Sequence, residues 1–283
     1  AETTKQLQQV QDIAQAKINQ LNTALEQLQR QLEAQKTRER QASPATVSAG
    51  NSKTDLGNTT FKLPNEGGTL EFIAVPGGTL RMEGGHQVNL QPFLMGKYPV
   101  TQRQYQAVMD KNPSRFQGDL DRPVEQVNWR EAIAFCKKLS EILKQDIDLP
   151  SETQWEWAAR GATKSQGFEY AGSNDLDEVG WYGNNSEGTT HPVGQKKPNE
   201  LGIYDLSGNV WEWCKDNGGD VKDLPVDGSP LTNGGDSNRR LLRGGSWIFL
   251  AGYCRSAYRD NYTPADRSYD LGFRVVCRSS RAL

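Results

Sequence analysis

Residues 241–277 read LLRGGSWIFLAGYCRSAYRDNYTPADRSYDLGFRVVC, and this stretch decides what kind of domain the chain forms. Doublets and triplets that share no chemistry separate three islands, which we call the framework segments: RGGSW (243–247), CRSAYR (254–259) and LGFR (271–274). Neither strand alternation nor helical spacing explains the stretch. The apolar triplet Ile248-Phe249-Leu250 stands where a loop is normally polar. The stretch therefore predicts long structured loops rather than regular elements.

The composition excludes several classes of function. The chain has 283 residues, with 33 Lys and Arg against 35 Asp and Glu and a net charge of −2. Nucleic-acid and anionic-membrane binders normally show a basic field, so we expect neither partner. No apolar run approaches the roughly 18 residues of a membrane helix, so we expect no membrane insertion.

The N-terminus, AETTKQLQQV, lacks the basic and apolar regions of a signal peptide, which favours a cytoplasmic location. It also lacks an initial Met, which fits a processed form or a piece of a longer chain.

Three regions differ in composition. Residues 1–42 lack Gly, Pro and aromatic residues, and from Ile18 to Leu32 their apolar residues follow heptad spacing. This pattern predicts a coiled-coil helix that associates with itself or another segment, with a single solvated helix as the alternative. Residues 43–66 are rich in Pro, Gly, Ser and Thr and predict a flexible linker. Residues 67–283 hold every Trp and Cys and predict one domain.

Within this domain, capping boxes predict three helices, near residues 101–110, 128–145 and 151–160. Alternation around Pro76 predicts an early hairpin. After Gly161 helical spacing disappears, and Gly, Asn, Asp and Trp punctuate short strands. The fold class expected from the residues is α+β, with few helices and long structured loops.

Five stretches in a fixed order carry a resemblance to a known family: GKYPVTQRQYQAVM (96–109), RPVEQVNWREAIAFCKKLS (122–140), LPSETQWEWAARG (149–161), GIYDLSGNVWEWCKD (202–216) and residues 241–277. Together they resemble the formylglycine-generating enzyme, or sulfatase-modifying factor, family over about residues 68–278. The resemblance implies a variant C-type lectin fold, preceded here by the coiled-coil-like helix.

The resemblance also implies a test for enzyme activity. Aerobic members of the family hold copper with two cysteines, two and seven residues after the Trp of RGGSW. Here these positions are Phe249 and Cys254, so one thiolate is absent and we expect no copper site and no oxidase activity. A second branch of the fold holds iron with several histidines, whereas this chain has only His86 and His191.

Residues 248–270 resemble the variable region of proteins that are diversified by retroelements, which mutate adenines of Asn codons into NNY codons. NNY codons cannot encode Lys, Glu, Gln, Met or Trp, and the twelve matching positions here contain none of these. We call them the variable positions: Ile248, Phe249, Leu250, Gly252, Tyr253, Asp260, Asn261, Tyr262, Asp266, Ser268, Tyr269 and Asp270.

The variable positions predict a ligand-binding surface, because binding loops favour Tyr with Ser, Gly and Asp. We expect all of them except Asn261 and Asp266 to share one accessible patch above buried Trp247, Arg255, Phe273 and Arg274. The expected ligand is a protein or another macromolecule. The alternatives are a copper-dependent oxidase that modifies a partner's cysteine and a non-catalytic regulatory module of a larger protein.

Residues 205–212 resemble the family's calcium loop. The resemblance implies a structural calcium ion held by Asp205, the carbonyl groups of Gly208 and Val210, and Glu212. The alternative is a structural turn in which both carboxylates bond backbone amides.

The resemblance also relates Cys136 to a cysteine that forms a disulfide near LGFR in secreted relatives, where Cys277 lies here. In an intracellular protein Cys136, Cys214, Cys254 and Cys277 would be free thiols.

Overall fold

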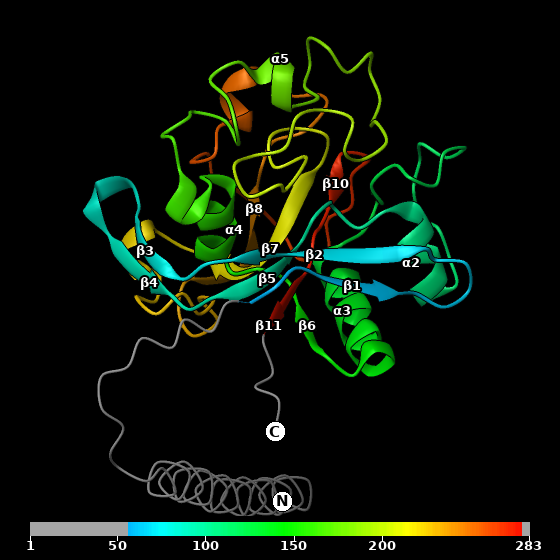
Figure 1. Ribbon diagram of the computed structural model, residues 1–283, viewed down its shortest axis with the longest axis horizontal. Helices are drawn as coiled ribbons and strands as arrows, with labels where there is room; N and C mark the ends of the chain where they lie inside the picture. The colour runs from blue at the N-terminus through cyan, green and yellow to red at the C-terminus, as the bar shows by residue number, and fades with distance from the viewer. Residues whose placement is uncertain (1–55, 279–283) are drawn as a thin grey trace, which may run out of the picture. The chain divides into compact units, whose positions relative to one another are not determined.

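The computed structural model describes residues 56–278 of the chain. The polypeptide divides into two units, Ala1–Thr54 and Asp55–Leu283, and the described residues belong to the second (Figure 1). The coiled-coil helix expected over residues 1–42 lies outside the described part. Within that part, no helix combines the length and the apolar character needed to cross a membrane.

The helices, including short 3-10 helices (η), and the strands follow one another in mixed order. They are β1 (Thr59–Lys62), β2 (Thr69–Val75), β3 (Gly78–Arg81), η1 (Glu83–Gly85), β4 (Gln87–Leu90), β5 (Phe93–Gly96), α2 (Gln102–Met109), α3 (Trp129–Leu143), β6 (Asp146–Asp148), α4 (Glu152–Ala159), η2 (Ala162–Lys164), α5 (Leu176–Val179), β7 (Trp211–Gly218), η3 (Val221–Asp223), β8 (Asp236–Arg243), η4 (Ala251–Cys254), β9 (Asp260–Tyr262), β10 (Leu271–Gly272) and β11 (Val276–Arg278).

The three expected helices are confirmed as α2, α3 and α4, and each begins with the predicted capping box. Thr101, Asn128 and Ser151 accept a hydrogen bond from the third backbone N–H of the helix, and the side chain at that position bonds back. These reciprocal bonds satisfy amides that have no partner within the helix. After Gly161 the one α-helix in the described part is the four-residue α5, and the α+β expectation is confirmed.

The strands form three sheets. The largest has the order β1-β2-β5-β11-β6, so β11 from the end of the domain pairs with β5 from its beginning. A second sheet has the order β10-β7-β8-β9, and β3 pairs with β4. Two expectations are wrong here. The linker expected over residues 43–66 contains β1, because Thr59–Lys62 alternate in burial and pair with β2. The hairpin expected at Pro76 does not form, because β2 pairs with β5 and β3 with β4.

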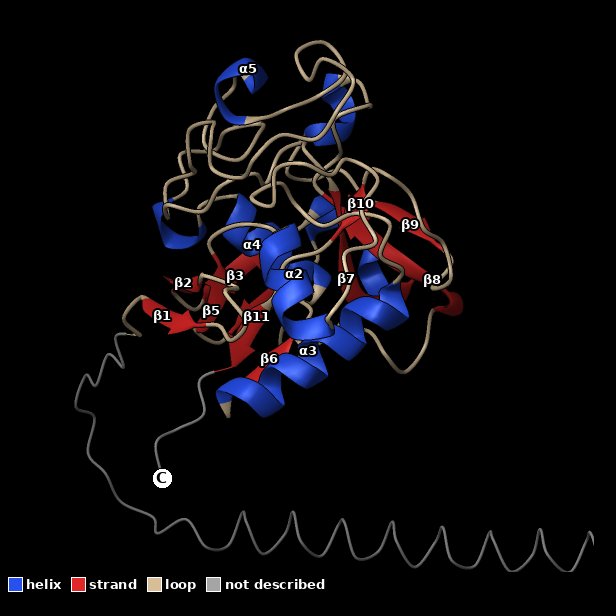
Figure 2. Cartoon of the chain, turned by 90° about the vertical axis from the view of Figure 1, so that its right-hand side faces the viewer, coloured by secondary structure: helices blue, strands red, loops and turns tan. Residues whose placement is uncertain are grey.

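Buried side chains join the sheets to the helices. Trp211 and Trp213 on β7 lie in one core with Tyr105 of α2 and Phe135 of α3. Figure 2 shows α2 and α3 in front of the large sheet, with β8, β9 and β10 together on one side of the domain. Residues 248–270 therefore include β9, at one edge of the second sheet, and lead into β10 at its other edge.

Candidate functional site

The variable positions occupy three segments: the loop that ends in η4, strand β9, and residues 266–270 just before β10. Eleven of the twelve expose surface to solvent. Ile248 and Leu250 are 45% and 68% exposed, which is unusual for large apolar side chains. The segments thus present apolar groups to solvent, as a binding surface does.

Two tryptophans bring the segments together. Trp211 contacts Phe249 edge-on, with ring centroids 5.6 Å apart, and its backbone N–H donates to the Asp270 carbonyl oxygen at 2.8 Å. Trp247 lies 5.6 Å from the ring of Tyr269, and its indole Nε1 donates to the Tyr269 carbonyl oxygen at 3.2 Å. The first and third segments therefore share one base.

Tyr262 of β9 connects the second segment to the third. Burial raises the pKa of its hydroxyl, and the negative charges of Asp270, Asp260 and Asp266 raise it further. Next to Tyr262, the Thr263 N–H donates to the Asp266 carboxylate at 2.8 Å, which ties the end of β9 to the third segment.

The Arg243 guanidinium, completely buried at the end of β8, fixes the backbone between the first two segments. It donates to the carbonyl oxygens of Ser256 at 2.9 Å, Ala257 at 3.1 Å and Tyr258 at 2.7 Å, and it forms an ion pair with Glu156. A planar guanidinium suits this task because its five N–H donors point in fixed directions.

The glycines of RGGSW allow close backbone contact. Gly245 has φ +73°, and a Cβ atom there would lie 2.7 Å from Cys254 Sγ and 2.9 Å from the Tyr253 carbonyl oxygen. Only glycine fits this approach without a shift of the backbone. RGGSW therefore holds η4 against the core.

Two expectations about burial are wrong. Asp270 is only 3% exposed, because its carboxylate accepts hydrogen bonds from the Ser246 hydroxyl at 2.8 Å and from Ser268. Arg255, expected to be buried, is exposed, and its Nε donates to the Gly252 carbonyl oxygen at 2.9 Å. Trp247, Phe273 and Arg274 are buried as expected.

Sequence reasoning missed the loop between α2 and α3. Phe116 contacts Trp247 and Tyr269 edge-on at 5.4 and 6.3 Å. The Arg115 guanidinium lies 4.9 Å from the centre of the Tyr269 ring. These residues precede Trp247 by about 130 positions and follow no periodic pattern, so no local signal could have placed them here.

Beneath this loop, Glu125 is completely buried, and one of its oxygens accepts the Phe116 N–H at 2.8 Å. Its other oxygen has no hydrogen-bond partner among the described residues. Burial raises the pKa of Glu125 to about 7.

Phe249 and Cys254 occupy the two positions at which the enzymes of the family carry cysteines, and they do not form a pair of thiolates. Phe249 packs against Trp211 and, at 5.0 Å between ring centroids, against Tyr253. Cys254 is completely buried, and burial raises the pKa of its thiol to about 12. A thiol with this pKa is a poor ligand for copper at neutral pH, because metal binding requires the thiolate. All four cysteines are buried free thiols in the structure.

The expected calcium ligands have other partners. Both oxygens of Glu212 accept hydrogen bonds from Arg274, at 2.6 and 2.7 Å, and the Trp155 indole also donates at 2.6 Å. Asp205 accepts the Gly194 N–H at 2.7 Å, as in the structural turn that was the alternative. A calcium ion would have to displace a guanidinium from Glu212, so this donor set does not fit the ion.

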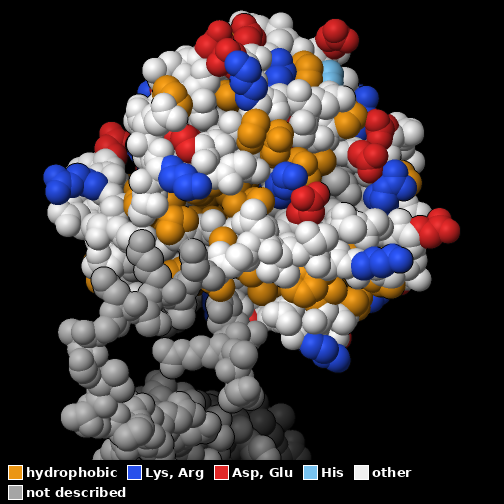
Figure 3. All heavy atoms as spheres, viewed as in Figure 1, with side chains coloured by type: hydrophobic (Ala, Val, Ile, Leu, Met, Phe, Trp, Pro, Cys, Tyr) orange, Lys and Arg blue, Asp and Glu red, His pale blue; other side chains and the backbone are white. Residues whose placement is uncertain are grey.

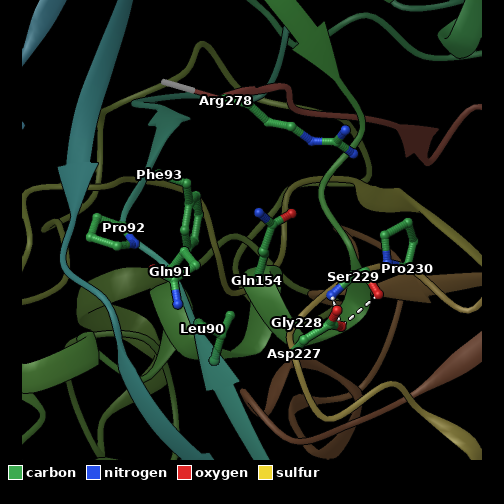
Figure 4. Close-up of a pocket in the computed structure, with 10 residues that line it drawn as sticks. All are labelled: Leu90, Gln91, Pro92, Phe93, Gln154, Asp227, Gly228, Ser229, Pro230 and Arg278. Atoms are coloured by element: carbon green, nitrogen blue, oxygen red, sulfur yellow. Dashed lines mark hydrogen bonds between the residues drawn. The ribbon is translucent and has the colours of Figure 1, made fainter. Parts of the chain in front are cut away.

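A cavity of about 350 Å³ lies away from the variable positions. Figure 4 shows Pro92 and Phe93 on one side, Ser229 and Pro230 on the other, and Gln154 between them. Neither this cavity nor a second of about 330 Å³ is lined by a variable position.

The family of sulfatase-modifying factor enzyme 1-like domains matches residues 58–279. Treponema denticola variable protein 1 has a similar structure, with a TM-score of 0.72 and 33% identity over 78% of this chain and 99% of that chain. Chaperone protein LppX of Paenibacillus barcinonensis is 34% identical over 73% of this chain and 89% of its own length.

The formylglycine-generating enzyme of Streptomyces coelicolor is 33% identical over 56% of this chain, and the match spans only 54% of that enzyme. The structural similarity to Treponema denticola variable protein 1 shows that the fold is the expected C-type lectin-like fold of variable proteins. The chain belongs to the family of sulfatase-modifying factor enzyme 1-like domains.

Proposed function

We propose that the domain is a non-catalytic binding module that displays a retroelement-diversified surface to a protein ligand. One observation carries the proposal: eleven of the twelve variable positions are accessible, while Arg243, Trp247 and Gly245 of RGGSW hold the backbone that presents them. The similarity to a protein named variable protein 1 supports this function. A relative named a chaperone also agrees with a protein ligand.

The experiment separates binding from folding. In one variant, the exposed residues Ile248, Leu250 and Asn261 are replaced together by other residues that NNY codons encode. Because surface substitutions usually change stability by less than about 0.5 kcal/mol each, the midpoint of thermal unfolding should move by only a few degrees.

Peptides selected from a random phage library on the original chain should no longer bind this variant. Unfolding of the variant at room temperature would contradict the proposal, as would undiminished binding of every selected peptide.

The copper-dependent oxidase remains the second candidate, because a relative that matches half of this chain is a formylglycine-generating enzyme. Incubation with a cysteine peptide, copper and oxygen tests it by mass spectrometry. We expect no formylglycine, because Phe249 occupies the first thiolate position and Cys254 is buried. Detectable product would replace the binding proposal.

A further inference from the structure

Arg115 stands apart from the other arginines around the binding surface. Arg259 donates to Glu152 at 2.8 Å, Arg267 forms an ion pair with Glu131, and Arg255 donates to the Gly252 carbonyl oxygen. Arg115 is exposed, and within residues 56–278 its guanidinium has neither an ion pair nor a hydrogen-bond acceptor. Its N–H donors are therefore available to a ligand.

Aromatic rings hold this free guanidinium in place. Its central carbon lies 4.9 Å from the centre of the Tyr269 ring and 5.7 Å from that of Phe116. Cation–π attraction of this kind favours the guanidinium and uses none of its N–H donors.

The loop that carries Arg115 is anchored on both sides of it. The Ser114 N–H donates to the Asn112 side chain at 3.1 Å, and the Phe116 N–H donates to Glu125 at 2.8 Å. Gln102 of α2 donates to the Phe116 carbonyl oxygen at 2.9 Å. The position of the arginine is therefore set before a ligand arrives, which reduces the entropy lost on binding.

The variable positions supply the complementary part of the chemistry. They include no Lys or Arg, and their most exposed large side chains are the apolar Ile248 and Leu250. Their acidic groups have local partners: Asp266 accepts the Thr263 N–H at 2.8 Å, and Asp260 accepts the Asn261 N–H at 2.7 Å. The surface thus combines an apolar area with the exposed guanidinium of Arg115.

We infer that the ligand is a protein segment that presents an Asp or Glu carboxylate to Arg115 beside an apolar side chain on the variable positions. The inference rests on the proposed function, because it assigns chemistry to the same surface. A carboxylate matches the guanidinium edge in a bidentate pair, which is among the stronger hydrogen-bonded interactions in proteins.

The test uses random linear peptides displayed on phage and selected on the full chain. Selected peptides are measured against Arg115→Gln, Arg115→Lys and the variant with replaced variable positions. Arg81→Gln is the matched control, because Arg81 is an exposed arginine on the separate β3–β4 sheet and its loss changes the net charge equally.

We expect Asp or Glu in the selected peptides and a loss of affinity of about ten-fold or more with Arg115→Gln. Arg115→Lys should recover part of this loss, because it keeps the charge but not the planar fork. Arg81→Gln should change nothing.

Two results overturn the inference and differ in what they leave standing. Peptides that bind Arg115→Gln normally but fail on the variant with replaced variable positions contradict the role of Arg115 and leave the proposed function intact. Peptides that bind both variants normally contradict the inference and the proposed function together.

Discussion

The framework segments and the variable positions alternate along the same stretch, yet they contribute to the structure through different atoms. The framework acts through side chains: Arg243 binds three carbonyl oxygens, and the Trp247 indole binds a fourth. The variable positions add hydrogen bonds through their backbone, as when the Phe249 carbonyl oxygen accepts the Gly183 N–H and the Asp270 carbonyl oxygen accepts the Trp211 N–H. Every residue type has these backbone atoms, so the loop can keep its shape when its side chains change.

Replacing Arg243, a framework residue, should cause the largest loss of stability. Arg243→Leu removes the donors to Ser256, Ala257 and Tyr258 and one of the two guanidinium groups paired with buried Glu156, the other being that of Arg160. We expect the free energy of unfolding to fall by about 3–5 kcal/mol in urea titrations.

Arg239→Leu, an exposed position on the same strand, serves as the control. Should Arg243→Leu fail to fold, Arg243→Lys provides the measurement. A loss below about 1 kcal/mol for both variants would show that surface burial alone fixes the loop.

The free energy of unfolding should depend on pH through Glu125, which is buried beneath the loop between α2 and α3. The folded state raises the pKa of Glu125 from 4.5 to about 7. As the pH rises from 4.5 through 7, the unfolded chain loses this proton first, so the stability of the folded state falls. Because one unit of pKa corresponds to about 1.4 kcal/mol, we expect roughly 1–3 kcal/mol more stability at pH 5 than at pH 8.

Glu125→Gln should reduce the difference in unfolding free energy between pH 5 and pH 8. The contribution of Asp216 should remain, because burial raises the pKa of Asp216 to about 7 as well. A variant with the unchanged pH dependence would show that Glu125 titrates normally.

Asp270 is a variable position, yet its side chain is buried and hydrogen-bonded as framework side chains are. Asp270→Ala leaves the Ser246 and Ser268 hydroxyls without their acceptor and should cost about 1–3 kcal/mol. Asn261→Ala, an exposed variable position, should cost less than about 0.5 kcal/mol. Equal costs in thermal unfolding would remove the distinction between the two positions.

The smallest effect is expected from a metal chelator. A calcium ion present at a hundred times its dissociation constant would add about 2.7 kcal/mol, which corresponds to several degrees in the unfolding midpoint. Because Arg274 already neutralises Glu212, we expect no shift on addition of chelator. A downward shift that Glu212→Ala abolishes would restore the calcium site.

The capping boxes predicted the three helices, because a capping box involves only four consecutive residues and can be read directly from the sequence. The resemblance predicted the fold, and the binding role of the variable positions stays a prediction. The burial of Asp270 could not be predicted, since it depends on a hydroxyl from Ser246, 24 residues earlier. Arg115 and Phe116 escaped for the same reason, because only tertiary packing brings their loop to Tyr269. Strand β1 is four residues long and lies at the end of a polar stretch, so its alternation was too short to detect.

The face in Figure 3 shows Lys and Arg interspersed with Asp and Glu, in keeping with the net charge of −2. Hydrophobic side chains gather between the charged groups on this face. Among the variable positions, the most exposed large side chains are the apolar Ile248 and Leu250.

Strand β9 lies at the edge of its sheet and is only three residues long, all of them variable positions. An open sheet edge with changing side chains would invite pairing between molecules and fibre growth. So short an edge offers few backbone groups to a neighbouring strand, and Asp260 already accepts the Asn261 N–H. The shortness of β9 limits this pairing whichever residues occupy positions 260–262.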